Sequence, residues 1–125
     1  MSFLSFLAVG LGSMAGGMCR YGISQALASK SLGFPLNTLL INLLGCLLIG
    51  LLAGLFERAA VASPVRLLCI TGFLGGFTTF STFSLESIQL FRVGNWQGAF
   101  AYIFISLIAG LGLSAAGFFL TRPQS

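Results

Sequence analysis

Long apolar runs dominate this sequence, and only short polar segments separate them. Of its 125 residues, 57% are hydrophobic and 6% are charged, whereas about a quarter of the residues in a soluble domain carry a charge. The runs between the charges are long enough to cross a hydrocarbon core of about 30 Å. The sequence therefore predicts an integral membrane protein. The charged residues are Arg20, Lys30, Glu57, Arg58, Arg66, Glu86, Arg92 and Arg122.

Four segments have the length and apolarity of membrane helices, roughly residues 3–27, 36–56, 65–91 and 96–120. Because lipid offers no hydrogen bonds to the backbone, only helices or a closed barrel can span it. The runs lack the two-residue alternation of a barrel. We therefore expect an all-α membrane protein with a single domain over residues 1–125 and four transmembrane helices.

Small residues recur at four-residue spacing within these segments, and this spacing lets membrane helices approach closely. We expect close helix packing at these positions, which are Gly12 and Gly16, Gly50 and Gly54, Gly72 and Gly76, and Ser106, Gly110 and Ser114.

The positive charges are balanced between the two sides of the membrane. A bias of Lys and Arg between short loops normally fixes the orientation of a membrane protein. Here alternating spans give three cations to each side, so the sequence permits insertion in both orientations and an antiparallel, dual-topology homodimer. One side receives Lys30, Arg92 and the nearby Arg20, and the other receives Arg58, Arg66 and Arg122.

The third segment is a poor helix former over residues 71–84. It contains the glycine pair Gly75 and Gly76, followed by five hydroxyl side chains in seven residues. Non-helical backbone at membrane depth is tolerated only where it is buried in protein or lines a polar cavity. We predict a helix break near the midplane whose freed carbonyls bind a cation. The alternative is that the glycines are packing notches and the hydroxyls bond to i−4 carbonyls.

Aromatic and hydroxyl side chains follow this stretch at helical spacing. Phe80 and Phe83 share a helix face, and Thr79 and Thr82 form a neighbouring stripe. Aromatic rings have a positive edge, so an anion could pass along ring edges and hydroxyl donors. The alternative is that both phenylalanines face lipid or serve only in packing.

Isolated polar residues interrupt the other spans. Asn42 stands alone in the second apolar run, where it either binds a ligand or joins two helices. Arg20 and Glu86 are ionisable groups within spans, and such groups are functional hypotheses by default. Tyr102 and Ser106 lie one turn apart in the fourth span.

Together these motifs closely resemble the bacterial fluoride channel family Fluc (CrcB) over essentially the whole chain. The resemblance is carried most specifically by the third-span motif and is supported by motifs in the other three spans. They are Gly72-Phe73-Leu74-Gly75-Gly76-Phe77-Thr78-Thr79-Phe80-Ser81-Thr82-Phe83, Gly12-x-x-x-Gly16-x-x-x-Arg20-Tyr21, Thr38-Leu39-x-x-Asn42-x-x-Gly45, and Tyr102-x-x-x-Ser106.

The resemblance implies an antiparallel homodimer with two fluoride pores in the bacterial cytoplasmic (inner) membrane. It would export fluoride passively and so lower its toxicity. A structural, non-transported Na⁺ would lie at the dimer centre, held by the backbone carbonyls of Gly75 and Thr78. Phe80 and Phe83 would line the pore, and Asn42 would donate to fluoride. Further polar contacts would come from Ser81, Thr82, Tyr102 and Ser106, with Arg20, Glu86 and Thr79 near the pore entrance or polar track.

Two other classes of membrane protein remain as alternatives. A small proton-coupled multidrug-type antiporter also has four helices, but that family carries its carboxylate in the first span, where residues 3–27 contain no acid. Glu86 is the only embedded candidate. The second alternative is a non-conducting accessory subunit, with apolar faces that bind a larger complex.

Several functions are excluded by composition. The six scattered cations form no basic stripe of the kind that nucleic acid requires. The sequence has no His and no Cys-x-x-Cys pair, so it indicates no zinc or redox site. It also has no nucleophile with a base at usable spacing, which argues against an enzyme.

Overall fold

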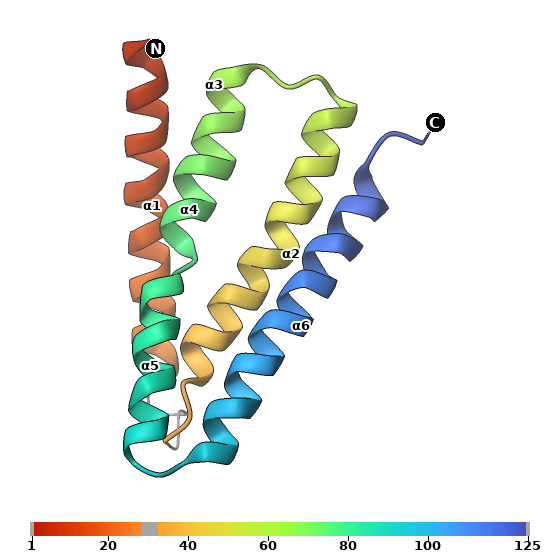
Figure 1. The fold of residues 1–125 in the computed structure, drawn as a ribbon. Coiled ribbons are helices and arrows are strands. Elements are labelled where there is room, and N and C mark those ends of the chain that lie inside the picture. Colours follow the sequence, from red (N-terminus) through yellow and green to blue (C-terminus); the bar gives the residue numbers. More distant parts are fainter. Residues whose placement is uncertain (1, 29–32, 125) are drawn as a thin grey trace.

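The fold consists of four long helical spans, as the sequence predicts. The computed structural model describes residues 2–28 and 33–124; Lys30, which we assigned to a loop, lies outside this part of the chain. All four spans are long and apolar enough to cross a membrane. They are α1 (Phe3–Leu27), α2 (Leu36–Arg58), a third span over Ser63–Arg92, and α6 (Trp96–Thr121). Both ends of the chain lie at the same end of the bundle (Figure 1).

The third span is built from several helical pieces. Two consecutive residues, Thr78 and Thr79, have extended backbone, with φ and ψ of −83° and 158° and of −149° and 114°. The pieces are α3 (Ser63–Arg66), a π-helical segment (Leu67–Leu74), α4 (Gly75–Phe77) and, after the extended pair, α5 (Phe80–Arg92). The glycine pair Gly75 and Gly76 is itself helical, so the non-helical backbone falls on the threonines that follow it.

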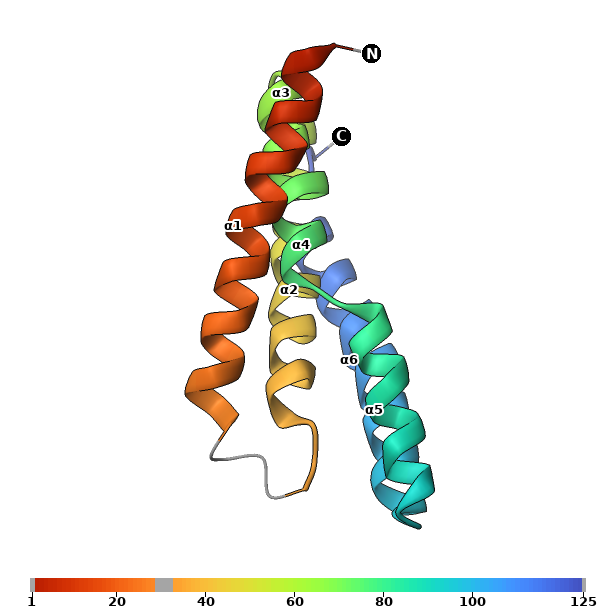
Figure 2. The same ribbon diagram turned by 90° about the vertical axis from the view of Figure 1, so that its left-hand side faces the viewer.

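The third span changes its neighbours at the extended pair. Before it, the π-helical segment and α4 pack against α1. After it, α5 packs against α6 and has moved away from α1 (Figure 2). Helix α2 runs beside α6 along most of its length (Figure 1). The extended pair therefore lies where the chain crosses from one helix pair to the other.

Facing glycines allow α1 and the third span to touch backbone to backbone. Gly12 and Gly16 of α1 are buried, and a Cβ atom on Gly16 would overlap the Phe73 carbonyl oxygen. A Cβ on Gly76 would overlap the Ser13 carbonyl oxygen in the same way. The prediction of close packing at small residues is confirmed here, and Gly76 acts as the packing notch that we considered as an alternative.

Helices α2 and α6 approach each other by the same means and add hydrogen bonds. A Cβ on Gly50 would overlap the Ser114 carbonyl oxygen. The Ser114 hydroxyl donates to the Cys46 carbonyl at 2.9 Å, and the Thr121 hydroxyl donates to the Leu51 carbonyl at 2.9 Å. Such bonds between helices stabilise packing in a medium that offers no competing water.

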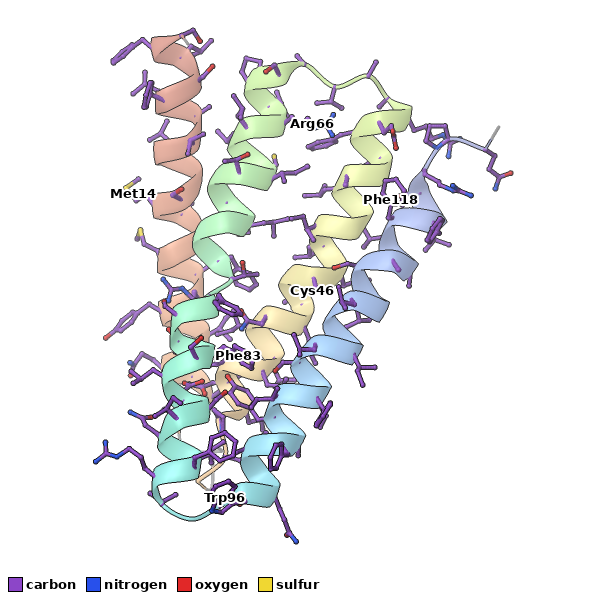
Figure 3. All side chains as sticks on the ribbon, in the orientation of Figure 1. Met14, Cys46, Arg66, Phe83, Trp96 and Phe118 are labelled. Carbon is purple, nitrogen blue, oxygen red and sulfur yellow. The ribbon has the colours of Figure 1, made fainter. Side chains whose placement is uncertain are left out.

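The two ends of the bundle carry the loop charges. Arg58 and Arg66 flank the turn between α2 and α3, at the end where the chain termini lie, and Arg122 follows α6 at that end. Arg92 ends α5 and Trp96 begins α6 on either side of the turn at the opposite end, where Figure 3 labels Trp96. A tryptophan at this position suits the interface between lipid and water.

Candidate pore groove

A groove of about 430 Å³ runs beside the extended pair, between α2, the third span and α6. The structure brings seven of the residues singled out by the sequence to its wall: Asn42, Gly75, Thr78, Thr79, Phe80, Phe83 and Ser106. Five others lie outside its lining: Arg20, Ser81, Thr82, Glu86 and Tyr102. The predicted cation ligands, the two phenylalanines and Asn42 therefore line the same groove.

Asn42 holds the extended backbone of Thr79 in place. Its Oδ1 accepts a hydrogen bond from the Thr79 N–H at 2.8 Å, and its Nδ2 donates to the Thr79 carbonyl at 3.1 Å. The side-chain amide thus pairs with one residue of backbone as a neighbouring strand would. Because an amide nitrogen has two N–H groups, Asn42 keeps one donor for another partner.

Thr79 is also the N-cap of α5. Its hydroxyl oxygen accepts a hydrogen bond from the Thr82 N–H at 3.2 Å, and its hydroxyl donates to Thr82 Oγ1 at 2.9 Å. An N-cap threonine satisfies one of the backbone donors that every helix start leaves unpaired. The sequence placed Thr79 and Thr82 on one polar stripe, and the structure shows that the two hydroxyls bind each other.

The groove offers backbone oxygens to a cation. Helix α4 ends at Phe77, and the last carbonyls of a helix have no partner within it. Gly75 and Thr78 both line the groove, whereas the Thr78 hydroxyl bonds to the Leu74 carbonyl at 2.9 Å. Among the described residues, no three His, Cys, Asp or Glu side chains lie together. Unwound backbone carbonyls are the donors with which membrane proteins bind Na⁺, so this donor set fits that ion.

Arg20 reaches from α1 to the third span. Its Nε donates to the Gly76 carbonyl at 3.1 Å, one residue beyond the groove-lining Gly75. The guanidinium therefore lies beside the end of α4 rather than pointing only to the membrane surface. A fixed cation beside the unpaired carbonyls of a helix C-terminus is electrostatically favourable.

Ser106 contributes an unused hydroxyl to the groove. Its Oγ is buried, and no described group forms a hydrogen bond with it. Most buried hydroxyls have a partner, so each exception requires an explanation. An anion in the groove would supply the missing acceptor.

Two aromatic rings lie at the same wall. The ring centroids of Phe80 and Phe83 are 5.5 Å apart with an interplanar angle of 44°. Phe80 is 75% exposed in the single chain, whereas Phe83 points from α5 toward α6, where its ring lies 5.2 Å from that of Tyr102 (Figure 3). The exposed ring is free to contact an ion or another chain.

Glu86 is held away from this groove by two hydroxyl donors. Its Oε1 accepts from the Thr38 hydroxyl at 2.8 Å and its Oε2 from the Tyr102 hydroxyl at 2.7 Å. Both donors are almost completely buried. Glu86 lines a separate cavity of about 500 Å³ at the far end of α5, together with Asn37 and Gln89.

Sequence analysis named Thr38 and Gly45 only as parts of a motif, and Thr71 only as part of a weak helix, and it gave none of the three a role at these sites. Thr38 lies one helical turn before Asn42, and Gly45 lies about one turn after it, so their spacing with Asn42 was the available signal. A Cβ on Gly45 would overlap the Thr78 methyl group, which shows that the glycine makes room for this side chain. Thr71 lines the groove from the π-helical segment.

Known proteins match this chain along nearly its whole length. The family described as "CrcB-like protein, Camphor Resistance (CrcB)" matches residues 7–118. A protein of Desulfotalea psychrophila named fluoride-specific ion channel FluC is 44% identical over 120 residues, which cover 95% of this chain and 93% of the relative. A protein of the same name from Chloroflexus aurantiacus is 48% identical over 109 residues, or 86% of each chain.

A third relative, from Prosthecochloris aestuarii, also bears the name fluoride-specific ion channel FluC. It is 42% identical over 124 residues, which cover 98% of this chain and 97% of the relative. The groove, the extended pair and the four spans thus lie within the matched region, and the chain belongs to the CrcB family.

Proposed function

We propose that this protein is a fluoride-specific ion channel that lets fluoride leave the cytoplasm passively and so lowers its toxicity. Support comes from membership of the CrcB family and from relatives named fluoride-specific ion channels that match nearly the whole chain. The protein is accordingly a channel and not an enzyme. It is a multi-pass membrane protein, and we assign it to the bacterial cytoplasmic membrane.

The observation that carries this proposal is the buried, unpartnered Ser106 hydroxyl in the same groove as Asn42, Phe80 and Phe83. Fluoride is small and strongly hydrated, so a pore must replace its water with donors. The groove supplies a hydroxyl, a remaining amide N–H and the positive edges of two rings. None of these is a full positive charge, so an ion that binds can also leave.

Other polar residues would extend this path beyond the groove. We assign Ser81, Thr82 and Tyr102 to further polar contacts along the pore. Arg20, Thr79 and Glu86 would lie near the pore entrance or the polar track. Tyr102 connects the groove to the end of the bundle, since its ring packs on Phe83 and its hydroxyl binds Glu86.

The working unit in this proposal is an antiparallel homodimer with two pores. An ion cannot cross a hydrocarbon layer in a groove that lies open to lipid, so a second chain must close it. Phe80 and Gly75 are exposed on the groove wall of the single chain. The balanced loop charges permit the two opposite orientations that such a dimer requires.

The extended pair would then form the break of the third span near the membrane midplane. Carbonyls of Gly75 and Thr78 from both chains would hold a structural Na⁺ at the dimer centre. When bound, this ion would supply positive charge between two sets of backbone oxygens. What supports the assignment is that both residues line the groove and that α4 ends between them.

A proton-coupled antiporter is the less favoured alternative. Its mechanism requires a carboxylate that faces the substrate cavity. Glu57 lies at the end of α2, and Glu86, the acid further inside a described span, lines a different cavity and has both oxygens bound by hydroxyl groups. Neither this alternative nor an accessory subunit has an observation in its favour.

A growth experiment tests the proposal in cells. We would express the chain in a bacterium from which its own fluoride exporters have been deleted and measure growth at rising fluoride concentration. The proposal predicts that the chain restores growth in fluoride. Failure of a correctly inserted, stable protein to restore growth would contradict it.

A further inference from the structure

The side chains of Asn42 and Thr79 occupy two particular backbone donors. In a continuous α-helix, each N–H bonds to the carbonyl four residues earlier. The Thr79 N–H would therefore bond to the Gly75 carbonyl, and the Thr82 N–H to the Thr78 carbonyl. Here the first bonds to Asn42 Oδ1 at 2.8 Å, and the second to Thr79 Oγ1 at 3.2 Å.

In a continuous helix, both N–H groups would bond to carbonyls of residues that line the groove. Gly75 and Thr78 line it, and each has lost its helical donor to a side-chain oxygen. A helix break by itself does not decide which carbonyls stay unpaired, because side chains and 3₁₀-type bonds can satisfy them. For Gly75 and Thr78, the two side chains therefore hold the N–H groups that a continuous helix would direct at these carbonyls.

The carbonyl that follows each of these two in the sequence accepts a hydrogen bond from a side chain. The Gly76 carbonyl accepts a hydrogen bond from Arg20 Nε at 3.1 Å, and the Thr79 carbonyl accepts one from Asn42 Nδ2 at 3.1 Å. Gly75 and Thr78 are therefore each followed by a residue whose carbonyl is occupied. An ion in the groove would meet the available pair without competition from its neighbours.

We propose that Asn42 and Thr79 are positioning residues for the central cation site: by accepting the Thr79 and Thr82 N–H groups, they keep the Gly75 and Thr78 carbonyls free to bind Na⁺. The inference rests on the proposed function, because it concerns the sodium ion expected in the dimeric channel. It gives Asn42 a structural task at its Oδ1 atom, separate from donation to fluoride by its nitrogen.

Sodium-dependent stability of the purified, detergent-solubilised protein tests this inference. The melting temperature is measured while NaCl replaces N-methyl-D-glucamine chloride at constant ionic strength. An ion that binds only the folded state stabilises it by RT ln(1 + [Na⁺]/Kd), so the dependence of the melting temperature on Na⁺ concentration yields the apparent Kd for Na⁺. This readout does not depend on fluoride transport.

Two variants at Thr79 test the role of its hydroxyl oxygen. Thr79→Ala removes the acceptor of the Thr82 N–H and lets that group return to the Thr78 carbonyl, whereas Thr79→Ser retains the acceptor. We expect the apparent Kd for Na⁺ to rise roughly tenfold in Thr79→Ala, as for the loss of one hydrogen bond. Thr79→Ser should match the wild type.

Asn42→Leu removes the second acceptor, the one that binds the Thr79 N–H, and should also raise the apparent Kd for Na⁺. Ser106→Ala alters the groove but no bond to these backbone groups, so it should keep the wild-type sodium response. If Asn42→Leu fails to fold, the Thr79 pair still decides. Wild-type sodium responses in Thr79→Ala and Asn42→Leu would overturn the inference.

Fluoride efflux from the same wild-type preparation separates the two proposals. Absence of any sodium-specific stabilisation, together with intact fluoride efflux, would overturn the positioning role and leave the channel assignment in place. Loss of efflux from folded protein would instead contradict the channel itself.

Discussion

Asn42 pairs with both backbone polar groups of Thr79, a residue 37 positions later in the chain. The pairing fixes α2 against the point where the third span leaves its helical path. Extended backbone at this depth would otherwise leave an N–H and a carbonyl unpaired in a medium without water. One amide side chain thus stabilises the extended pair beside which the groove lies.

Replacement of Asn42 should destabilise the fold. Asn42→Leu keeps a similar volume but removes both hydrogen bonds and leaves the Thr79 backbone groups without their partner. We expect the free energy of unfolding to fall by about 1–3 kcal/mol, measured by denaturant or thermal unfolding in detergent. An unchanged unfolding free energy would show that this pairing does not stabilise the protein.

Gly16 and Gly17 provide a matched test of the contact between α1 and the third span. A Cβ on Gly16 would overlap the Phe73 carbonyl oxygen, whereas a Cβ on Gly17 meets nothing within 4 Å. Gly16→Ala should force the helices apart and lower stability by about 1–3 kcal/mol. Gly17→Ala should be neutral or stabilise by up to about 1 kcal/mol through helix propensity.

The same thermal unfolding assay distinguishes these two variants. Equal effects of both substitutions would contradict the close approach at Gly16. A loss of stability confined to Gly17→Ala would show that the face of α1 that packs on the third span had been assigned wrongly.

Thr38 and Tyr102 should be energetically coupled through Glu86. Each hydroxyl donates to a different oxygen of one carboxyl group. Thr38→Val and Tyr102→Phe should each destabilise by about 1–2 kcal/mol, and their effects should not add, because the two bonds share a partner. A double-mutant cycle of unfolding free energies measures this coupling, and a coupling energy of zero would contradict the shared carboxyl group.

Ser106 should affect transport without supporting the fold. Its buried hydroxyl has no partner among the described groups, so Ser106→Ala should leave stability unchanged or raise it by up to about 1 kcal/mol. Fluoride efflux should nevertheless fall, by about fivefold if one hydrogen bond to the ion is lost. A large loss of stability with normal efflux would assign Ser106 to the fold instead of the pore.

Much of the fold was predictable because lipid imposes simple rules. Only helices satisfy their backbone in a chain of uninterrupted apolar runs, and the four spans follow from that requirement. The small residues identified the close contacts, but spacing alone did not reveal that Gly12 faces Gly72 or that Gly76 faces Ser13. The partner of a helix depends on the arrangement of all spans.

The local form of the third span was harder to predict. Its residues 71–84 indicated weak helix formation, yet Gly75 and Gly76 are helical and the extended residues are Thr78 and Thr79. The position is determined by bonds to Asn42, which lies on another helix. No local propensity contains that information, and none predicts the π-helical segment Leu67–Leu74.

For the candidate site too, the sequence identified individual residues but not their partners. Polar residues inside apolar spans marked Asn42, Glu86 and Ser106 as candidates, since such residues are costly in lipid. Their partners could not be read from the sequence, because the bonds of Glu86 to Thr38 and Tyr102 join three separate spans.

Fluoride efflux from liposomes reconstituted with the purified protein is the most direct test of the channel assignment. Vesicles loaded with potassium fluoride or potassium chloride are compared in the presence of valinomycin, and Phe80→Ile is tested beside the wild type. The account predicts rapid loss of fluoride with little loss of chloride, and slower fluoride loss from the variant because the exposed Phe80 ring lines the groove. Absence of fluoride loss from correctly folded protein, or equal loss of the two anions, would contradict it.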